Sequence, residues 1–243
     1  MKPYIQFMIF VFFALLFIGE IKGQGGLVDS PIELEEHTLI SSFTQFSFSE
    51  ISRNYFDKFA DMLNVEGEFF LDKEWTKGTI YFKSKQKITN DSIRYFVYGK
   101  EMHVSYNGKT MAIINQKMMD SIVLKDHKFV YQDFVHGSKM AHDYLELLSN
   151  HSIKLYKHYS SKFIKAKEVS SYQEQEEDRY VIREKYYIGS ENEAPHFFKP
   201  SKKNVISLFA NEKKEVQEYV KKNNLKYSQE ADLVQVFNYF AID

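Results

Sequence analysis

The middle of the chain is a succession of short segments in which apolar and polar residues alternate, and this feature most narrows the choice of fold. Turn residues separate the segments, and no stretch between them carries a helical pattern. The segments span residues 67–71, 79–83, 92–98, 101–106, 109–115, 120–124, 127–134, 143–148, 152–159 and 179–189. Parallel strands need crossover connections of about a dozen residues or more, so strands this closely spaced must pair antiparallel. The pattern therefore predicts an antiparallel β-meander.

Two turns in this region predict β-hairpins. Asn107-Gly108 separates two alternating segments, and this dipeptide favours the two-residue turn in which both residues have positive φ. Ser149, Asn150 and His151 separate another pair of segments. Aromatic residues make up 16% of the chain, which favours a sheet because aromatic side chains pack well on a pleated surface.

The pattern changes near Pro195, after which three short amphipathic helices are expected. Ser201, Asn211 and Ser228 are the predicted N-caps, because their side-chain oxygens can accept hydrogen bonds from free backbone N–H groups. Helices this short are marginal in isolation, so they must pack on each other or on the sheet. The predicted fold class is therefore α+β, an antiparallel β-meander followed by a small C-terminal bundle of short helices. The corresponding predicted domains are a β-rich domain at 65–194 and a helical subdomain at 195–243, packed on the sheet.

The first residues predict a cleaved signal peptide. Lys2 provides a positive start, and residues 7–18 form an uninterrupted apolar run. A helix of about 12 residues is roughly 18 Å long, which is too short for the ~30 Å hydrocarbon core of a membrane. Gly23 is a small residue suited to signal peptidase, which predicts a signal peptide at 1–23 and a mature chain that begins at Gln24. An uncleaved anchor and a buried N-terminal helix are the alternatives.

Residues 24–64 are predicted to form a leader with one amphipathic helix. Ser49 is the expected cap, and Ile51, Tyr55 and Phe59 follow on one helix face. The residues before Ser49 contain many turn formers and show no clear period, so no other regular element is expected there.

The absence of cysteine and the balanced charge limit the compartment and the partners. Without a cysteine the chain cannot carry the acylated residue of a bacterial lipoprotein, and no disulfide can stabilise it. The 32 basic and 33 acidic side chains leave no net field that attracts nucleic acid. We therefore expect an exported protein, periplasmic or extracellular, that is not a lipoprotein and does not bind nucleic acid. After signal cleavage no transmembrane anchor is expected.

Common catalytic and metal-binding motifs do not occur at the spacing that their chemistry requires. YNGKT at 106–110 ends like a phosphate-binding loop, but His103 stands where the first glycine of that loop belongs. His136 and His142 are six residues apart, which is typical of neither helical nor strand metal ligands. Trp75 is either a platform for a stacked ligand or a residue that packs the end of the sheet. The sequence predicts no catalytic residue, no cofactor and no metal site.

The most distinctive parts of the chain are GEFFLDKEWTKGTIYFKSKQKITNDSIRYFVYGKEMHV, MMDSIVL, YLELLSNHSIKLYKHY, REKYYIG and SKKNVISLFANEKKEVQEYVKKNNLKYSQEADLVQVFNYF. From about Glu66 to the C-terminus they resemble a large family of exported, uncharacterised proteins of the Bacteroidota. The W-x-x-G-x-I-x-F strand and the lysine-rich terminal helices are the most specific parts of this likeness. The resemblance implies export and a shared architecture, and it brings no activity and no site residue. Residues 25–63 extend beyond the short leader that is usual in that family.

Three functions follow from these observations. The first is a non-enzymatic envelope or periplasmic protein that acts as a binding or scaffolding module, with envelope proteins or a lipid as candidate partners. The alternative is a carrier of a lipid or another apolar ligand in an aromatic-lined trough of the sheet. The residues expected to line that trough, unless they simply form the core, are Phe69, Phe70, Tyr81, Phe96, Tyr98 and Phe129. The third is a hydrolase that uses paired carboxylates, such as Glu66 with Glu68.

Overall fold

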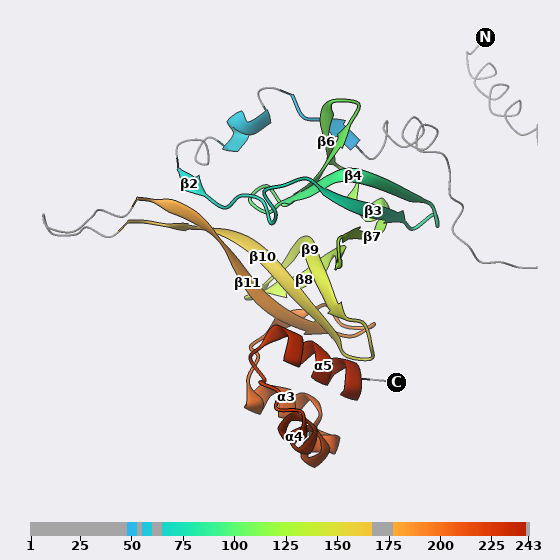
Figure 1. Cartoon of the computed structure of the whole chain (residues 1–243), viewed down its shortest axis with the longest axis vertical. Helices are drawn as coiled ribbons and strands as arrows, with labels where there is room; N and C mark the ends of the chain where they lie inside the picture. The colour runs from blue at the N-terminus through green and yellow to red at the C-terminus, as the bar shows by residue number, and fades with distance from the viewer. Residues whose placement is uncertain (1–47, 53–54, 60–64, 167–176, 242–243) are drawn as a thin grey trace, which may run out of the picture. The chain divides into compact units, whose positions relative to one another are not determined.

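The computed structural model of the chain describes residues 48–52, 55–59, 65–166 and 177–241. The chain divides into two units, Met1–Ser30 and Pro31–Asp243, and all of the described residues belong to the second unit. The predicted signal peptide and most of the predicted leader lie outside the described residues. The described part is mostly β, with a closed barrel of five strands, further strands beside it and three α-helices at its C-terminal end (Figure 1).

One part of the sheet is open and has the strand order β1-β6-β5-β4-β3-β7; we call it the six-strand sheet. Its strands are β1 Phe48–Glu50, β3 Thr76–Phe82, β4 Lys87–Phe96, β5 Glu101–Tyr106, β6 Lys109–Ile113 and β7 Met119–Leu124, with the 3₁₀ helix η2 Gln116–Met118 before β7. The predicted hairpin at Asn107-Gly108 is confirmed, since Tyr106 pairs with Lys109 and both turn residues have positive φ. Ile80, Ile93 and other apolar residues of these strands are fully buried and form the core of this sheet.

The sheet continues from β7 into β8 and then closes on itself. The barrel strands are β8 His127–His136, β9 Lys139–Ser149, β10 Lys154–Ile164, β11 Arg179–Gly189 and β12 His196–Phe198. β8 pairs with β9, β9 with β10, β10 with β11, β11 with β12, and β12 again with β8. β10 and β11 extend beyond the barrel as a long hairpin, and the short strand β2 Glu66–Gly67 pairs with β11 there (Figure 1).

Barrel closure depends on β12, a strand that the predicted antiparallel meander did not include. β12 directly follows Pro195 and lies inside the segment that was predicted to be helical. Its His196 pairs parallel with Val135 of β8, whose N–H donates to the carbonyl of Pro195 at 2.7 Å. A strand of three residues is too short to show a period in the sequence. Its pairing nevertheless covers the edges that β8 and β11 would otherwise leave open.

Inward-pointing residues of the barrel strands form an apolar plug. Phe134, Leu145, Tyr156 and Tyr187 are buried and pack together. The rings of Phe134 and Tyr187 meet edge to face, with their centroids 5.0 Å apart. A barrel of five strands has a narrow interior, so four large side chains are enough to fill it at this level.

The three C-terminal helices are α3 Lys202–Leu208, α4 Lys213–Lys222 and α5 Glu230–Phe240, with the 3₁₀ helix η3 Ala210–Glu212 between the first two. Ser201 caps α3 as predicted, because its hydroxyl accepts a hydrogen bond from the N–H of Asn204 at 3.2 Å. The caps of α4 and α5 are Glu212 and Gln229, each one residue after the predicted position.

The helices pack on the outer wall of the barrel. Their buried apolar residues form one cluster with Leu155, Ile188 and Phe198, which point outward from β10, β11 and β12. The helices thus find on the barrel the apolar surface that short helices need for stability. None of the helices among the described residues has the length and apolar content to cross a membrane.

In the predicted leader, the described residues form a strand and a single 3₁₀ turn. β1 pairs with β6 and places Phe48 in the core of the six-strand sheet. Tyr55–Phe59 is the 3₁₀ helix η1. The predicted helix cap at Ser49 is therefore wrong, because strand pairing and the burial of Phe48 hold this residue in an extended conformation.

Candidate functional site

Polar residues follow the apolar plug along the inward face of β10 and β11. The cross-strand pair next to the plug tyrosines is His158 with Lys185, and the following pair on that face is Ser160 with Arg183. Every second residue of a strand points to the same face, so the register that buries the tyrosines also places these four side chains together. The inward face of these two strands therefore changes from buried apolar residues to polar ones, of which Arg183 and Lys185 are exposed.

These side chains line a pocket of about 570 Å³, which we call the barrel-mouth pocket. Its lining residues are Lys100, Phe134, His136, Ala141, His158, Ser160, Ser161, Lys162, Arg183, Glu184 and Lys185. All of them belong to β8, β9, β10 and β11 except Lys100, which comes from the turn between β4 and β5. The volume falls within the roughly 300–1,000 Å³ that is usual for small-molecule sites.

Asp143 is fully buried on the inward face of β9, next to His158. Its Oδ1 accepts hydrogen bonds from the hydroxyl of Tyr95 at 3.2 Å and from the backbone N–H of Tyr144 at 2.8 Å. Its Oδ2 lies 2.9 Å from Nε2 of His158 and 3.5 Å from Nζ of Lys100. Burial, reinforced by the charge of Asp143, raises the pKa of Tyr95 well above its ordinary value, so the phenol stays a donor. These contacts stabilise the carboxylate, which in turn fixes the orientation of the His158 ring.

The other ring nitrogen of His158 is buried and has no hydrogen-bond partner among the described residues. His158 lines the barrel-mouth pocket. Buried polar atoms are almost always hydrogen-bonded, and an unsatisfied one costs about 1–3 kcal/mol. An atom of this kind in a residue that lines a pocket indicates a site where a polar molecule can bind.

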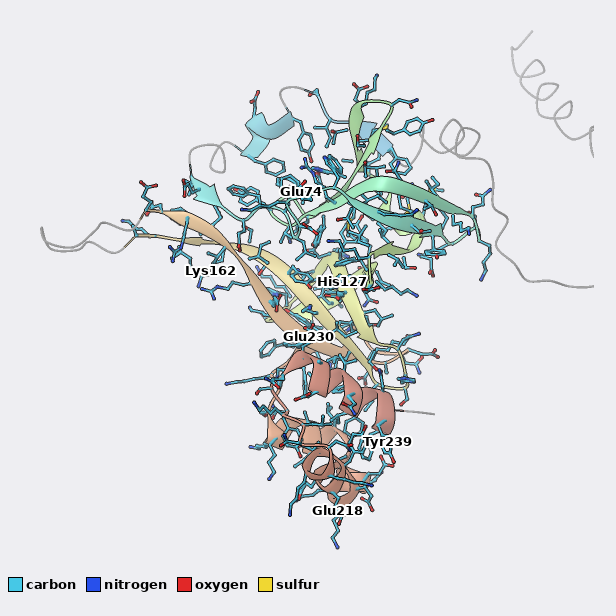
Figure 2. The ribbon with its side chains drawn as sticks, in the orientation of Figure 1. Glu74, His127, Lys162, Glu218, Glu230 and Tyr239 are labelled. Atoms are coloured by element: carbon cyan, nitrogen blue, oxygen red, sulfur yellow. The ribbon has the colours of Figure 1, made fainter. Side chains whose placement is uncertain are left out.

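Basic side chains predominate in the lining of this pocket. Lys100, Lys162, Arg183 and Lys185 line the pocket, whereas Glu184 is the single acidic residue in its lining. Lys100 lies near Asp143, but no carboxylate of the described residues is within ion-pair distance of the other three. Figure 2 shows Lys162 on the part of β10 that extends beyond the barrel. This surplus of positive charge favours an anion in the pocket.

His136 adds a titratable group to the same pocket. Its Nδ1 lies 3.0 Å from the hydroxyl of Tyr187, and its ring centroid is 6.4 Å from that of His158. Partial burial lowers the pKa of His136 below its ordinary value of 6.5, and the positive charges of Lys185, His158 and Lys100 lower it further. His136 is therefore neutral at pH 7 when the pocket holds no anion.

The opposite face of β10 carries a second polar cluster, which we call the Glu146 network. Glu146 is buried; one of its oxygens accepts from the hydroxyl of Tyr159 at 2.5 Å, and the other lies 2.5 Å from Nδ1 of His127. Nζ of Lys157 lies 3.1 Å from Glu146 and 2.8 Å from Glu230, at the start of α5. Figure 2 shows His127 near the junction of the barrel with the six-strand sheet, and Glu230 where α5 meets the barrel. The network therefore connects the barrel to α5.

Charges in the Glu146 network are compensated. Burial raises the pKa of Glu146, but hydrogen bonds from Tyr159 and His127 and the charge of Lys157 outweigh this effect, so the pKa is lowered. Burial lowers the pKa of Lys157, but Glu230 and Glu146 outweigh that effect and raise it. The carboxylate and the ammonium each favour the charged form of the other.

The aromatic residues predicted to line an apolar trough do not all gather in one place. One ring cluster contains Phe69, Phe70, Phe96 and Tyr98, with neighbouring centroids 4.9–6.2 Å apart. Phe129 instead packs against Tyr95 in the core, and Tyr81 lines a different pocket together with Asp120. Phe96 and Phe129 are fully buried, as core residues are.

The sequence analysis missed the residues of the barrel-mouth pocket and considered His136 only as a possible metal ligand. Asp143, the partner of His158, lies on β9, and Tyr95, which donates to Asp143, precedes it by 48 positions in the sequence, so no local motif shows these contacts. One signal was present in the sequence. Asp143 occupies the same alternate positions as Leu145 and Leu147, so a carboxylate stands on an otherwise apolar face of β9.

In the ranges that the structure describes, no group of three or more histidine, aspartate or glutamate side chains is placed to hold a metal ion. Comparison of the chain with models of protein families, with curated proteins and with solved structures gives no match. The resemblance to exported proteins of the Bacteroidota therefore stays a prediction, and the function has to be argued from the site.

Proposed function

We propose that the protein is an exported, non-enzymatic binding module that holds a small ligand with a phosphate or similar oxyanion group in the barrel-mouth pocket. One observation carries this proposal. Nδ1 of His158 is buried without a partner among the described residues, and His158 lines a pocket with a surplus of basic side chains. Export is taken from the predicted signal peptide.

An oxyanion matches the donors that line the pocket. The guanidinium of Arg183 presents a planar set of N–H groups, and Lys185 adds a flexible point charge. The hydroxyl of Ser160, which donates to the carbonyl of Arg183 at 3.4 Å, can turn to donate to a further oxygen of the same group. Hydrogen bonds between charged partners are roughly twice as strong as neutral ones, and a phosphate can accept several at once. Phe134 offers an apolar surface for the remainder of the ligand.

In this proposal Asp143 and His158 hold the ligand rather than transform it. Nε2 of His158 is engaged by Asp143, so Nδ1 is the ring nitrogen left for a ligand. A hydrogen on Nδ1 can be donated to the anion while Asp143 faces the other ring nitrogen, so the ring links the ligand to Asp143. The alternative function, a carrier of an apolar ligand, stays a prediction. The six residues expected to line its trough are divided between a ring cluster, the core and a separate pocket, which does not favour it.

Isothermal titration calorimetry with sulfate and inorganic phosphate, at constant ionic strength set with chloride, tests the proposal. We expect saturable binding of both anions. Arg183→Gln and Lys185→Gln should each weaken it about tenfold, because a hydrogen bond to a charged group contributes about 1.5–3 kcal/mol. Lys214→Gln on the exposed face of α4 changes the net charge equally and should leave binding unchanged.

Two outcomes would overturn the proposal. If Lys214→Gln weakened anion binding as much as the pocket variants do, or if the heat of binding never saturated, the anions would be attracted by the net charge and not bound at a site. Turnover of aryl phosphates or aryl esters that disappears in His158→Gln would identify an enzyme instead of a binding module.

A further inference from the structure

A second pocket, of about 190 Å³, lies where the six-strand sheet meets the barrel, and we call it the Arg94 pocket. β3, β4 and β7 contribute Thr76, Arg94 and Leu124 to its lining, whereas Phe129 and Tyr159 come from barrel strands. This pocket shares no lining residue with the barrel-mouth pocket. An inference about it is therefore independent of the proposed function.

Arg94 is held against two aromatic rings. Its Cζ lies 3.9 Å from the ring centroid of Phe70 and 4.1 Å from that of Trp75. Such cation–π contacts cover the flat faces of a guanidinium, whereas its N–H groups point outward in the plane and stay available. Trp75 thus packs on an arginine, a role that neither sequence interpretation of this residue included.

The positive charge of Arg94 has no counterpart among the described residues. Its Nε is buried without a hydrogen-bond partner, and no described carboxylate forms an ion pair with its guanidinium. Burial lowers the pKa of Arg94, and no neighbouring acid offsets this effect. Charged groups that leave water are normally paired, because removing an unpaired charge from water is costly.

The other charged residues of the pocket are already engaged. Asp72 accepts a hydrogen bond from Nζ of Lys125 at 2.6 Å, and this contact lowers the pKa of Asp72. His127 is bonded to Glu146, whose charge is compensated by Lys157. The charge of Arg94 is therefore the one charge in the lining of this pocket that no described residue compensates.

We infer that the Arg94 pocket binds a small carboxylate, with the carboxyl group on the guanidinium of Arg94. The planar guanidinium matches a carboxylate through two parallel N–H···O bonds. Leu71, Leu124 and Phe129 provide an apolar wall for a short hydrocarbon part. At about 30 Å³ for each water, the volume corresponds to roughly six water molecules, which suits an acid of a few carbon atoms and excludes a long acyl chain.

Trp75 makes the test direct, because it is the single tryptophan of the chain and it packs on Arg94. Its fluorescence is followed while acetate or propionate replaces chloride at constant ionic strength. We expect a saturable change in emission with either acid. Arg94→Lys keeps the charge but loses the planar donor set, so the affinity should fall at least tenfold, and Arg94→Gln should abolish the response. Lys185→Gln in the barrel-mouth pocket should leave the response intact.

A second measurement uses the unaltered protein, so misfolding of a variant cannot affect its result. The Nε–H resonance of Arg94 in the unaltered protein should shift saturably with acetate, at the same midpoint as the fluorescence. The inference is overturned if neither signal saturates, or if the fluorescence response survives Arg94→Gln. An equal response to sulfate would identify a general anion site and would overturn the assignment to a carboxylate.

Discussion

Lys157 and His158 are neighbours on β10, yet the two faces on which they lie differ in how completely their polar groups are paired. Lys157 is buried between Glu146 and Glu230, and hydrogen bonds from Tyr159 and His127 complete the coordination of Glu146. On the inward face, Nδ1 of His158 has no partner among the described residues. In the pocket lining, Lys162, Arg183 and Lys185 have no described carboxylate within ion-pair distance.

This difference indicates two roles: the paired groups on the outward face stabilise the fold, and the unpaired groups on the inward face are available to a ligand. A buried polar network in which every member is satisfied holds its surroundings in one arrangement. Unsatisfied polar atoms reduce stability, and natural proteins tolerate them mainly at functional sites. We therefore expect substitutions on the outward face of β10 to change stability, and substitutions on the inward face to change binding.

Replacement of Lys157 by methionine should have the largest effect on stability. The substitution leaves Glu146 buried without its cation, and the removal of one partner from a buried ion pair costs about 3–5 kcal/mol. Urea unfolding measures this loss. Lys185→Met on the inward face should change the unfolding free energy by no more than about 0.5 kcal/mol. Similar losses in the two variants would remove the distinction between the faces.

Tyr159→Phe should lower the unfolding free energy by about 2 kcal/mol at neutral pH, since it removes a hydrogen bond to the charged Glu146. The pKa of Glu146 is lower in the folded state than its ordinary value of 4.5, so the carboxylate stabilises the fold above pH 4.5. That stabilisation is lost as the pH falls through the folded-state pKa. The difference between the two proteins should therefore shrink in acid, as thermal melts at several pH values would show. A difference that is constant with pH would contradict this origin, and Tyr239→Phe at an exposed position serves as the control.

Sulfate should bind several-fold more tightly at pH 5.5 than at pH 8. The pKa of His136 is lowered in the empty pocket, and an anion beside it should raise that pKa again. Binding is then coupled to proton uptake, and the affinity rises as the pH falls through the range near 6.5. Sulfate does not titrate in this range, so calorimetry at several pH values reports on the protein alone. His136→Gln should flatten the profile, and a profile that remains equally steep would exclude His136 as the source.

Ser161→Ala should have the smallest effect. In the free protein its buried hydroxyl has no partner, so its removal should be neutral or slightly stabilising. Ser152→Ala is the matched comparison, because the hydroxyl of Ser152 donates to the carbonyl of Ala241 at 2.8 Å and its loss should cost about 1 kcal/mol. Equal losses in urea unfolding would show that Ser161 has a structural partner after all.

Local patterns in the sequence predicted the local elements of this fold. Alternation located the strands of the hairpins, Asn107-Gly108 predicted its turn, and Ser201 predicted the start of α3. The closure of the barrel could not be predicted, because it depends on a three-residue strand whose His196 pairs with the distant Val135. Nor did the cap at Ser49 form, since burial of the preceding side chain outweighed the local preference.

The candidate site was not predicted for a related reason. His158 carries no motif, and its role arises only when β9 and the turn before β5 bring Asp143 and Lys100 beside it. The basic residues Arg183 and Lys185 look like an ordinary solvated strand in the sequence. They become part of one site because the register with β10 places them opposite Ser160 and His158.

The most direct test of an oxyanion site in the barrel is to follow the imidazole nitrogens of His158 by NMR while phosphate is added at constant ionic strength. If the anion completes the site, the Nδ1 resonance should shift saturably, with the midpoint that calorimetry gives, and Nε2 should keep its bond to Asp143. If both nitrogens remain unchanged while only exposed lysine side chains respond, the pocket does not hold the anion and the central claim is contradicted.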